Sequence, residues 1–478
     1  MIRIFSLRVF ASSPTREKLT SPQNSTGIAG AWHVADASST VYYLLHGLQH
    51  RGSDGAGIAA ADGANVLVYK HAGMLAEIFN ADRLASLPGD LAIGQVRTAT
   101  TSDISSENLQ PVMVRAHQGS FAVVSTGMVL NAPSLRRHME AEGLIFQGTS
   151  DAEIIAHLIQ VSEGKMVDKV ETAAHLLKGS FAFIVMTKNT MYAVLSRQAV
   201  QSLYFAKLGD GVLFSQETSG FGLFDVEDIT PIEPGQMIIL GKEGFKTRQI
   251  DIGSAHPCSM ECVYYSREDS LFNGQSIHKI RQALGIGLAK DETMTADMVI
   301  GVPDTAMAAA SAFARTLKVP YELGLIKNRY VGSTFVRPAR EQKEQSIKVR
   351  LNAISSIVKG KSIFLVDDSL QKGATAAHLC RMLKEAGAKE VHLRIASPKI
   401  LYSCIFGTEY IEAKDLAARN YDENELCELF EADSLRFLDP ERFEEALGES
   451  ACKACMSGNY FTNGLDYEQL RGCGKEIQ

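Results

Sequence analysis

The chain lacks the features that mark several special classes of protein. No apolar run in its 478 residues is long enough to span a bilayer, and no block of like charge occurs. The formal net charge of −7 excludes a basic nucleic-acid groove. Eight cysteines in so long a chain do not make the dense disulfide scaffold of small secreted proteins. We therefore expect a soluble, cytoplasmic protein that binds neither membrane nor nucleic acid.

The length fits two or three domains, and the sequence has two textures. From Thr26 to about residue 250, short apolar runs alternate with turn residues, which predicts an α+β layered domain with many strands. One helix is predicted there, over residues 151–163. From about residue 275, apolar strands alternate with helices, which predicts a parallel sheet covered on both faces. Roughly the last 80 residues are predicted to form a helical tail on that second domain.

The most informative stretch is FLVDDSLQKGATAAHL, residues 364–379. Its buried strand delivers Asp367 and Asp368 to the carboxyl end, where open α/β sheets bind ligands. A loop with a glycine and hydroxyl side chains follows, and its backbone N–H groups can hold a phosphate ahead of the next helix. Paired aspartates also occur in turns and helix caps. Strand, diacid and loop together favour a site for a sugar phosphate, whose hydroxyls or metal ion the carboxylates would bind.

The same stretch resembles the signature with which type I phosphoribosyltransferases bind phosphoribosyl pyrophosphate (PRPP). The segments GVPDTAMAAA, PYELGLIKNRYVGSTF, LVDDSLQKGAT and EAGAKEVHLRIASP also occur in the order found in glutamine-dependent amidophosphoribosyltransferases, the enzymes that open purine synthesis. In the first half, LQHRGSDGAGI, GQVRTAT, ENLQP and LKGSFAF match that family's N-terminal-nucleophile (Ntn) glutaminase domain. The similarity runs from Thr26 to about residue 463.

The resemblance implies an α+β Ntn glutaminase-like domain over residues 26–255. An α/β type I phosphoribosyltransferase domain with a C-terminal helical tail would then occupy residues 256–478. Residues 1–25 fit a propeptide, a transit-like segment or a misplaced start codon, and we favour the propeptide. The implied activity is that of a glycosyltransferase, which forms 5-phosphoribosylamine from Mg-PRPP in the first step of de novo purine synthesis. The resemblance also implies a homo-oligomer and purine nucleotide effectors.

For the second domain, the resemblance assigns the residues that bind PRPP. Asp367 and Asp368 would hold the ribose or its Mg²⁺, and Thr305 would lie near the metal and the pyrophosphate. Lys327 and Arg329 would close over the diphosphate. The loop for the 5-phosphate would contribute Ser369, Lys372, Gly373, Ala374 and Thr375.

Three positions of this domain depart from the family pattern. Lys372 replaces an arginine and loses its bidentate geometry, while Ala374 replaces a threonine. Ser333 replaces another arginine, which should weaken closure of a loop over PRPP. Two alternatives therefore stand beside an active enzyme: a non-catalytic paralogue that senses PRPP or nucleotides or pairs with a true transferase, and a transferase that uses a different amine.

In the first domain, Thr26 stands at the position of the family's N-terminal cysteine nucleophile. Cleavage before Thr26 would free its amine, but a threonine hydroxyl is far less acidic and nucleophilic than a thiol. The family's HNGN, whose first asparagine and following glycine form the oxyanion hole, here reads STGM and keeps only Gly127. Losing one oxyanion donor costs about 10²–10³ in rate. The segment SRQAVQSL also replaces the family's DPNGLRPL.

Two residues nevertheless match the family's contacts to glutamine. Arg97 would bind the substrate carboxylate and Asp151 its amine, although Asp151 equally suits an N-cap of the helix over residues 151–163. A glutamine-shaped pocket is therefore expected, with the hydrolysis lost. Ammonia, free or delivered, would replace glutamine as the amine donor.

Four cysteines fall where some family members hold a [4Fe–4S] cluster: Cys258, Cys404, Cys452 and Cys455. A Cys-x-x-Cys pair alone also fits zinc, redox chemistry or chance. Four cysteines at family positions favour the cluster, which would fasten the domain junction near Cys258 to the C-terminal tail.

Overall fold

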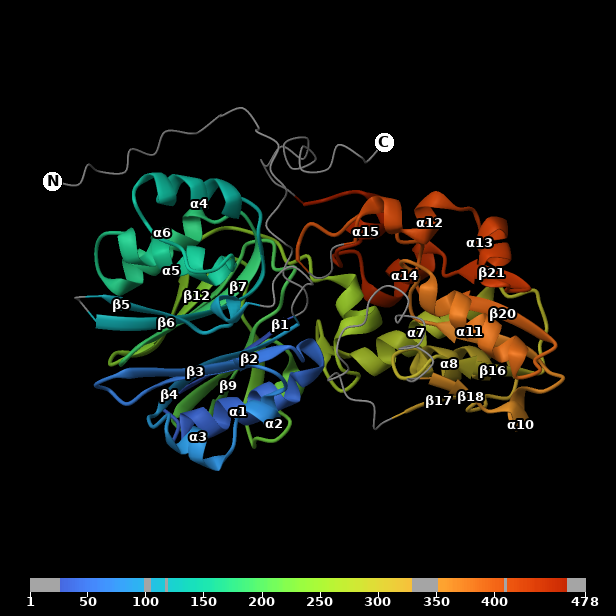
Figure 1. Ribbon diagram of the computed structural model, residues 1–478, viewed down its shortest axis with the longest axis horizontal. Coiled ribbons are helices and arrows are strands. Elements are labelled where there is room, and N and C mark those ends of the chain that lie inside the picture. Colours follow the sequence, from blue (N-terminus) through green and yellow to red (C-terminus); the bar gives the residue numbers. More distant parts are fainter. Residues whose placement is uncertain (1–25, 99–104, 117–118, 329–350, 408–410, 462–478) are drawn as a thin grey trace.

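The computed structural model describes residues 26–98, 105–116, 119–328, 351–407 and 411–461. They form two halves that lie side by side, coloured blue to green and yellow to red in Figure 1. The first half is a sandwich of two antiparallel sheets between layers of helices, and the second is a parallel sheet with helices. No helix in these ranges is long and apolar enough to cross a membrane.

Both sheets of the sandwich are antiparallel throughout. Within the described residues the first has the spatial order β11 (Glu227–Pro231), β9 (Tyr204–Leu208), β10 (Gly211–Ser215), β1 (Thr26–Trp32), β4 (Leu91–Arg97), β2 (Gly55–Ala61) and β3 (Val66–Ala72). The second has the order β13 (Gly244–Gln249), β12 (Gln236–Gly241), β8 (Met191–Leu195), β7 (Gly179–Thr187), β6 (Gly119–Val129) and β5 (Val112–Ala116). Alternate strand residues share a face, so side chains such as Ile28, Ile93 and Ile184 meet in a core between the sheets. The predicted layered domain is confirmed.

Helices cover both outer faces of the sandwich (Figure 1). On the first sheet lie α1 (Ala37–Gly47), α2 (Leu75–Ile78) and α3 (Ala81–Ala85), and on the second α4 (Ala132–Ala141), α5 (Asp151–Val161) and α6 (Met166–Leu176). The helix predicted over residues 151–163 is confirmed as α5. The expectation of one helix is wrong, because α1 carries its own helical stripe of buried Val41, Leu44 and Leu45 among the strand-rich runs.

In the second half, four of the described strands form a parallel sheet in the order β16 (Met298–Gly301), β19 (Ser362–Asp367), β20 (Glu390–Ile395) and β21 (Ser434–Phe437). The predicted helices follow β16 and β19 as α8 (Met307–Leu317) and α11 (Ala374–Glu385). The tail is not purely helical as predicted. Leu435 and Phe437 of β21 alternate with less buried polar residues and pack into the core, and β21 forms one edge of the sheet.

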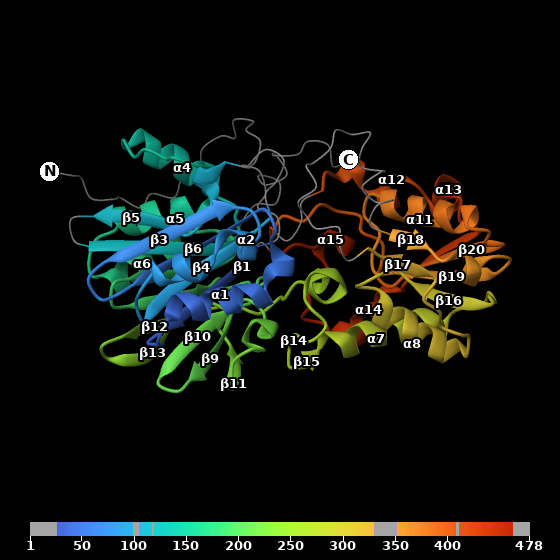
Figure 2. The ribbon, with the colours of Figure 1, turned by 60° about the horizontal axis from the view of Figure 1, so that its bottom comes forward.

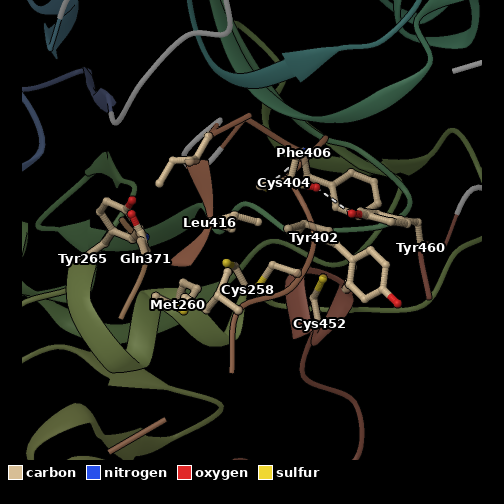
Figure 3. Close-up of a pocket in the computed structure, with 16 residues that line it drawn as sticks. Cys258, Met260, Tyr265, Gln371, Tyr402, Cys404, Phe406, Leu416, Cys452 and Tyr460 are labelled. Atoms are coloured by element: carbon tan, nitrogen blue, oxygen red, sulfur yellow. Dashed lines mark hydrogen bonds between the residues drawn. The ribbon is translucent and has the colours of Figure 1, made fainter. Parts of the chain in front are cut away.

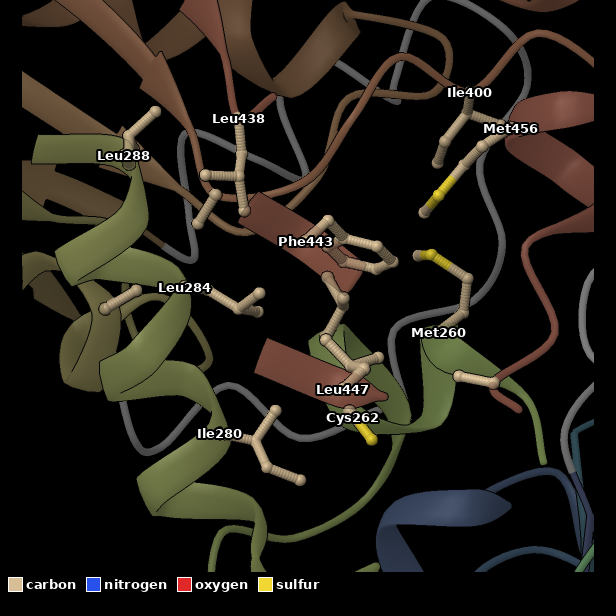
Figure 4. Packing of buried hydrophobic residues seen from close by; sticks show 14 of the residues in the cluster. Met260, Cys262, Ile280, Leu284, Leu288, Ile400, Leu438, Phe443, Leu447 and Met456 are labelled. Atoms are coloured by element: carbon tan, nitrogen blue, oxygen red, sulfur yellow. The ribbon is translucent and has the colours of Figure 1, made fainter. Parts of the chain in front are cut away.

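An apolar core joins the tail to the junction between the halves (Figure 4). It surrounds the π-helix η4 (Glu261–Tyr265), which leads into α7 (Ile277–Lys290), and the tail helix α14 (Pro440–Leu447) packs against α7. Figure 4 labels side chains that meet there: Met260, Cys262, Ile280, Leu284, Leu288, Leu438, Phe443 and Leu447. The segment that connects the two halves is therefore fixed by tight packing.

Shorter elements complete the described chain. Figure 2 shows β14 (Leu271–Phe272) and β15 (Gln275–Ser276) at the junction beside α7. The remaining strands and helices are β17 (Leu325–Lys327), β18 (Leu351–Ala353), α10 (Ser355–Val358), α12 (Ala417–Asn420), α13 (Glu423–Phe430), α15 (Ala454–Ser457), η1 (Gln49–Arg51), η2 (Ser106–Asn108), η3 (Thr218–Phe221) and η5 (Ala413–Asp415).

Candidate functional site

Two buried carboxylates stand at the carboxyl end of strand β19. Asp367 ends the strand and Asp368 follows it, and they are only 8% and 7% exposed. Thr305, in the loop after β16, donates a hydrogen bond to Asp368. Ser369 donates to the other oxygen of the same carboxylate at 2.6 Å. Because β16 and β19 are parallel neighbours, their carboxyl ends bring the predicted residues of both loops together.

Both carboxyl groups have raised pKa values. Burial is the main cause, and the charge of Asp368 adds to the rise at Asp367. The hydroxyls of Ser369 and Thr305 oppose the rise at Asp368, and so does the positive charge of Arg281. A cation would offset both the burial and the mutual repulsion of these oxygens. Two carboxylates beside a hydroxyl are oxygen ligands of the kind Mg²⁺ prefers, so the donor set fits that ion.

The loop after Asp368 has the form of a phosphate cradle. Gly373 caps α11 at φ +78°, and a β-carbon there would lie 2.5 Å from the ring of Phe430. Ala374 and Thr375 begin the helix and are exposed, so the first-turn N–H groups are available to an anion. Lys372 is exposed at the loop, with its Nζ 2.9 Å from the carboxylate of Asp415.

The residues expected to close over the diphosphate are described only in part. Lys327 of β17 donates to the carboxylate of Asp304, which precedes Thr305 in the loop after β16. The peptide bond between Pro303 and Asp304 is cis. This contact places the Lys327 ammonium at the same edge of the sheet as the diacid. Arg329, together with position 333, lies outside the described residues.

In the first half, Thr26 opens β1 and is 5% exposed. Its Oγ1 lies 2.6 Å from Oγ1 of Thr126, on β6 of the other sheet. Gly127 follows at φ +89°, where a β-carbon would lie 2.3 Å from the carbonyl oxygen of Ser180. The two positions that depart from the family pattern therefore face each other. The Thr26 hydroxyl has a neutral hydroxyl as its partner, which is no general base.

Two buried glutamines that the sequence analysis missed complete this site. The Gln216 carboxamide lies 2.8 Å from the carbonyl oxygen of Thr26 and 3.1 Å from Nη1 of Arg51, in the orientation that satisfies both. The carboxamide of Gln201 lies 3.2 Å from that of Gln216. Arg51 lies in the segment LQHRGSDGAGI, which matches the family, and Gln201 lies in SRQAVQSL, which departs from it. These two segments are the sequence signals that could have pointed to Arg51 and Gln201. Nothing in the sequence marks Gln216.

Both residues expected to contact glutamine are buried. Arg97 ends β4 and pairs with Thr26 in the strand register, and its guanidinium donates to the carbonyl of Asn108. Asp151 accepts a hydrogen bond of 2.8 Å from the N–H of Val129, two residues after Gly127. The N-cap of α5 is the preceding serine, so the interpretation of Asp151 as the cap is wrong. Its carboxylate turns toward β6 and away from its own helix.

Asp151 should make the stability of the protein depend on pH. Burial raises its pKa to about 7, against the opposing effect of the Val129 hydrogen bond. Between the unfolded pKa of about 4 and pH 7, the folded chain holds a proton that the unfolded chain releases. The free energy of unfolding should therefore fall by up to about 1.4 kcal/mol for each pH unit of increase in this window.

The variant Asp151→Asn removes this dependence and keeps an oxygen for the Val129 N–H. Urea unfolding at pH 5 and pH 8 measures the difference in free energy of unfolding between variant and parent. The free energy of unfolding of the variant, relative to that of the parent, should be higher at pH 8 than at pH 5. A difference that stays constant would contradict the buried, protonated carboxyl.

The four cysteines that are predicted to bind the cluster line one cavity, and three of these cysteines are labelled in Figure 3. The N–H of Cys452 donates to the carbonyl of Pro257 at 2.9 Å, which joins its segment to that of Cys258. The carbonyl of Cys455 accepts N–H groups from residues 401 and 402 at 2.9 Å, just before Cys404. The fold thus brings together three segments that are far apart in the sequence.

The chemistry of these thiols fits a cationic group. Burial raises the pKa of Cys452 to about 12 and that of Cys455 further, and the charge of Cys404 adds to both. A bound cation would stabilise the thiolates. In the described ranges, no three Cys, His, Asp or Glu side chains are grouped as ligands of one metal ion. Four thiolates are the donor set that a [4Fe–4S] cluster takes, one for each iron.

Comparisons with known proteins agree with this two-part arrangement. A family model for glutamine amidotransferase domains matches residues 95–221, and one for phosphoribosyl transferase domains matches residues 273–397. The amidophosphoribosyltransferase of Bacillus subtilis is 38% identical over 446 residues, covering 91% of this chain and 94% of the relative. That of Staphylococcus aureus strain Mu50 is 34% identical over 453 residues, covering 92% of each. A solved glutamine PRPP amidotransferase from B. subtilis, complexed with ADP and GMP, has a TM-score of 0.86 at 38% identity, covering 91% of this chain and 97% of that one.

Proposed function

The chain belongs to the amidophosphoribosyltransferase family, and we propose that it forms 5-phosphoribosylamine from Mg-PRPP and ammonia in the first step of de novo purine synthesis. The buried pair of Asp367 and Asp368 beside a phosphate-type loop is the observation that carries the proposal. We place the glutaminase-like domain at residues 26–255 and the transferase domain at residues 256–478. A cytoplasmic location is part of the proposal.

The described residues suggest how the transferase site would work. Asp367 and Asp368 would hold the ribose or its Mg²⁺, with the Thr305 hydroxyl orienting the second carboxylate. The loop after them and the first turn of α11 would bind the 5-phosphate. As the bond from C1 to pyrophosphate breaks, C1 gains oxocarbenium character and the nitrogen lone pair of ammonia attacks it. The added nitrogen then gives up one proton to water. Lys327 would stabilise the charge that develops on the leaving diphosphate, and Mg²⁺ would neutralise more of it.

Ammonia is proposed as the amine donor because the glutaminase-like site pairs two hydroxyls. Thr26 has no thiolate, and Thr126 occupies the position of an amide donor of the oxyanion hole. The buried positions of Arg97 and Asp151 support a pocket that binds glutamine without hydrolysing it. Purine nucleotides are proposed as effectors, since the B. subtilis relative was solved with ADP and GMP. A homo-oligomer is also part of the proposal.

Pyrophosphate release from Mg-PRPP tests the proposal. It should be observed with ammonium and be near background with glutamine or with no amine. Release with glutamine at a rate comparable to that with ammonium would overturn the loss of glutaminase activity. PRPP binding without release under any condition would instead identify a PRPP-sensing paralogue.

We also propose a [4Fe–4S] cluster on Cys258, Cys404, Cys452 and Cys455. Protein purified without oxygen should be brown and contain iron and sulfide in equal amounts. Replacing Cys455 by serine should remove most of the colour and the iron. The matched change Cys427→Ser, outside the cavity, should keep both. Colourless protein with stoichiometric zinc would contradict the cluster.

A further inference from the structure

A hollow in the first half lies where the end of α6, the start of β7 and the loop after β8 meet. We call it the α6 hollow. Its floor is apolar and includes the buried residues Leu177, Phe181 and Val194. Its rim carries titratable residues that are half-buried or exposed: His175, Lys178, Arg197 and Asp251. The described residues that line it include none of those proposed to bind PRPP, glutamine or the cluster.

Gln198 is the buried polar residue of this hollow. It is 6% exposed and lines the α6 hollow. Its backbone carbonyl accepts the N–H of His256 at 2.9 Å, but its carboxamide forms no hydrogen bond with the described part of the chain. A mostly buried carboxamide without a partner costs free energy. A molecule in the hollow that offers a donor or an acceptor to Gln198 would recover that cost.

The loop after β8 holds Gln198 in a fixed conformation. Ala199 has φ +43°, a left-handed conformation that costs free energy for a residue with a β-carbon. Its N–H donates to the carbonyl of Ser196 at 3.1 Å, and Oγ of Ser196 accepts the N–H of Phe181 at 3.1 Å. The family's DPNGLRPL has proline and asparagine where this chain has Arg197 and Gln198. These two polar side chains at the hollow are therefore features of this chain and not of the family's motif.

The charges at the rim favour an anion. Lys178 forms no ion pair with any other residue that the structure describes. Nη1 of Arg197 lies 3.7 Å from Oδ2 of Asp251, which is too far for a hydrogen bond. The rim thus holds two permanent positive charges against one negative charge, and an anion placed there is attracted.

We propose that the α6 hollow is a binding site for a small organic anion. Its negative group would lie between Lys178 and Arg197, and its apolar part would rest on Phe181. A donor or acceptor of the ligand would pair with the carboxamide of Gln198. The site is separate from the transferase site, and its occupancy does not depend on PRPP.

Protection of Lys178 from acetylation by an uncharged N-hydroxysuccinimide ester tests the proposal. Lys178 directly precedes β7 and the exposed Lys188 directly follows it, so Lys188 is the internal control. The probes are propionate, ethylphosphonate and the neutral propionamide, which share one alkyl chain, at equal concentration and constant ionic strength. Peptide mass spectrometry measures the rate at each lysine. At least one of the two anions should slow acetylation of Lys178 by at least about threefold, and propionamide should not.

Variants show whether the effect arises in the α6 hollow. In Gln198→Leu, which removes the carboxamide and keeps most of the side-chain volume, the protection should fall below about 1.5-fold. The matched control is Gln201→Leu, because Gln201 is buried three residues further along and its carboxamide contacts Gln216 outside the hollow. This control should keep the protection. Should Gln198→Leu not fold, Arg197→Gln changes a half-buried side chain and should reduce the protection at least about twofold.

Each outcome supports the site or overturns it. Protection by propionate alone identifies a carboxylate ligand, and protection by ethylphosphonate alone identifies a phosphate-type ligand; both support the site. Absence of protection by either anion overturns it, and so does equal protection by propionamide. Equal slowing at Lys188 would show general screening by salt and overturn the site as well. Unreduced protection in the variant of Gln198, or in that of Arg197 where it is needed, has the same consequence.

Discussion

Replacing both Asp367 and Asp368 by asparagine is expected to abolish Mg-dependent binding of PRPP. Asparagine keeps the size of each side chain but removes the charge that would hold the ribose or its metal ion. Hydrogen bonds to charged groups contribute about 1.5–3 kcal/mol each, so the loss of two contacts should weaken binding by roughly 10²–10⁴-fold. Titration calorimetry of parent and double variant in excess Mg²⁺ measures this directly.

The double variant of Asp367 and Asp368 should be at least as stable as the parent. A loss of PRPP binding in this variant therefore cannot be explained by a loss of folding. Burial and mutual repulsion raise the pKa of both carboxyls, so their charged forms destabilise the folded chain above the unfolded pKa. Asparagine removes that cost, and the melting temperature of the variant should rise relative to the parent as the pH is raised from 5 to 8. A matched control is Asp297→Asn, because Asp297 accepts an N–H from Ser362 at the other end of β19. Equal PRPP affinity of parent and double variant would remove the site assignment.

The parts of the fold that the sequence predicts well are those in which local pattern and tertiary role agree. An apolar strand followed by two aspartates, a glycine and a helical stripe has few other structures available, and β19 and α11 follow it closely. The segments that form β21 and α1 are harder to predict from the sequence. A four-residue strand such as β21 has too few alternations to stand out within a helical context, and α1 lies among strand-like runs.

The residues of the candidate sites also fall into those that the local sequence pattern predicts and those that it does not. The aspartates are visible because a strand, a diacid and a glycine-containing loop occur together, and the four cysteines are visible because they match positions of the family. Gln216 is a single polar residue without a local signature, and only the fold places it beside the carbonyl of Thr26. Its position depends on contacts between residues far apart in the sequence, such as the approach of its carboxamide to Arg51. Reasoning from local pattern has no access to such contacts.

The largest change in activity is expected from Thr26→Cys combined with Thr126→Asn. The parent should form almost no glutamate from glutamine, even with PRPP present. Thr26→Cys supplies a nucleophile but leaves the Thr126 hydroxyl, 2.6 Å from the nucleophile position, where an amide donor is needed. The loss of one oxyanion donor costs about 10²–10³ in rate, and groups that act as one catalytic unit are not additive. Each single variant should therefore stay nearly inactive.

The double variant, expressed so that the introduced cysteine is the N-terminal residue, should form glutamate at least about 10²-fold faster than either single variant. The matched control is Thr26→Cys with Thr126→Val, because valine keeps the shape of threonine and provides no donor. That control should remain as slow as Thr26→Cys alone, since Gly127 would be the one donor left of the family's pair. The decisive measurement is glutamate formed from glutamine by the parent with PRPP present. Turnover comparable to an ordinary glutaminase, abolished by Thr26→Ala, would show that threonine is the working nucleophile of this chain.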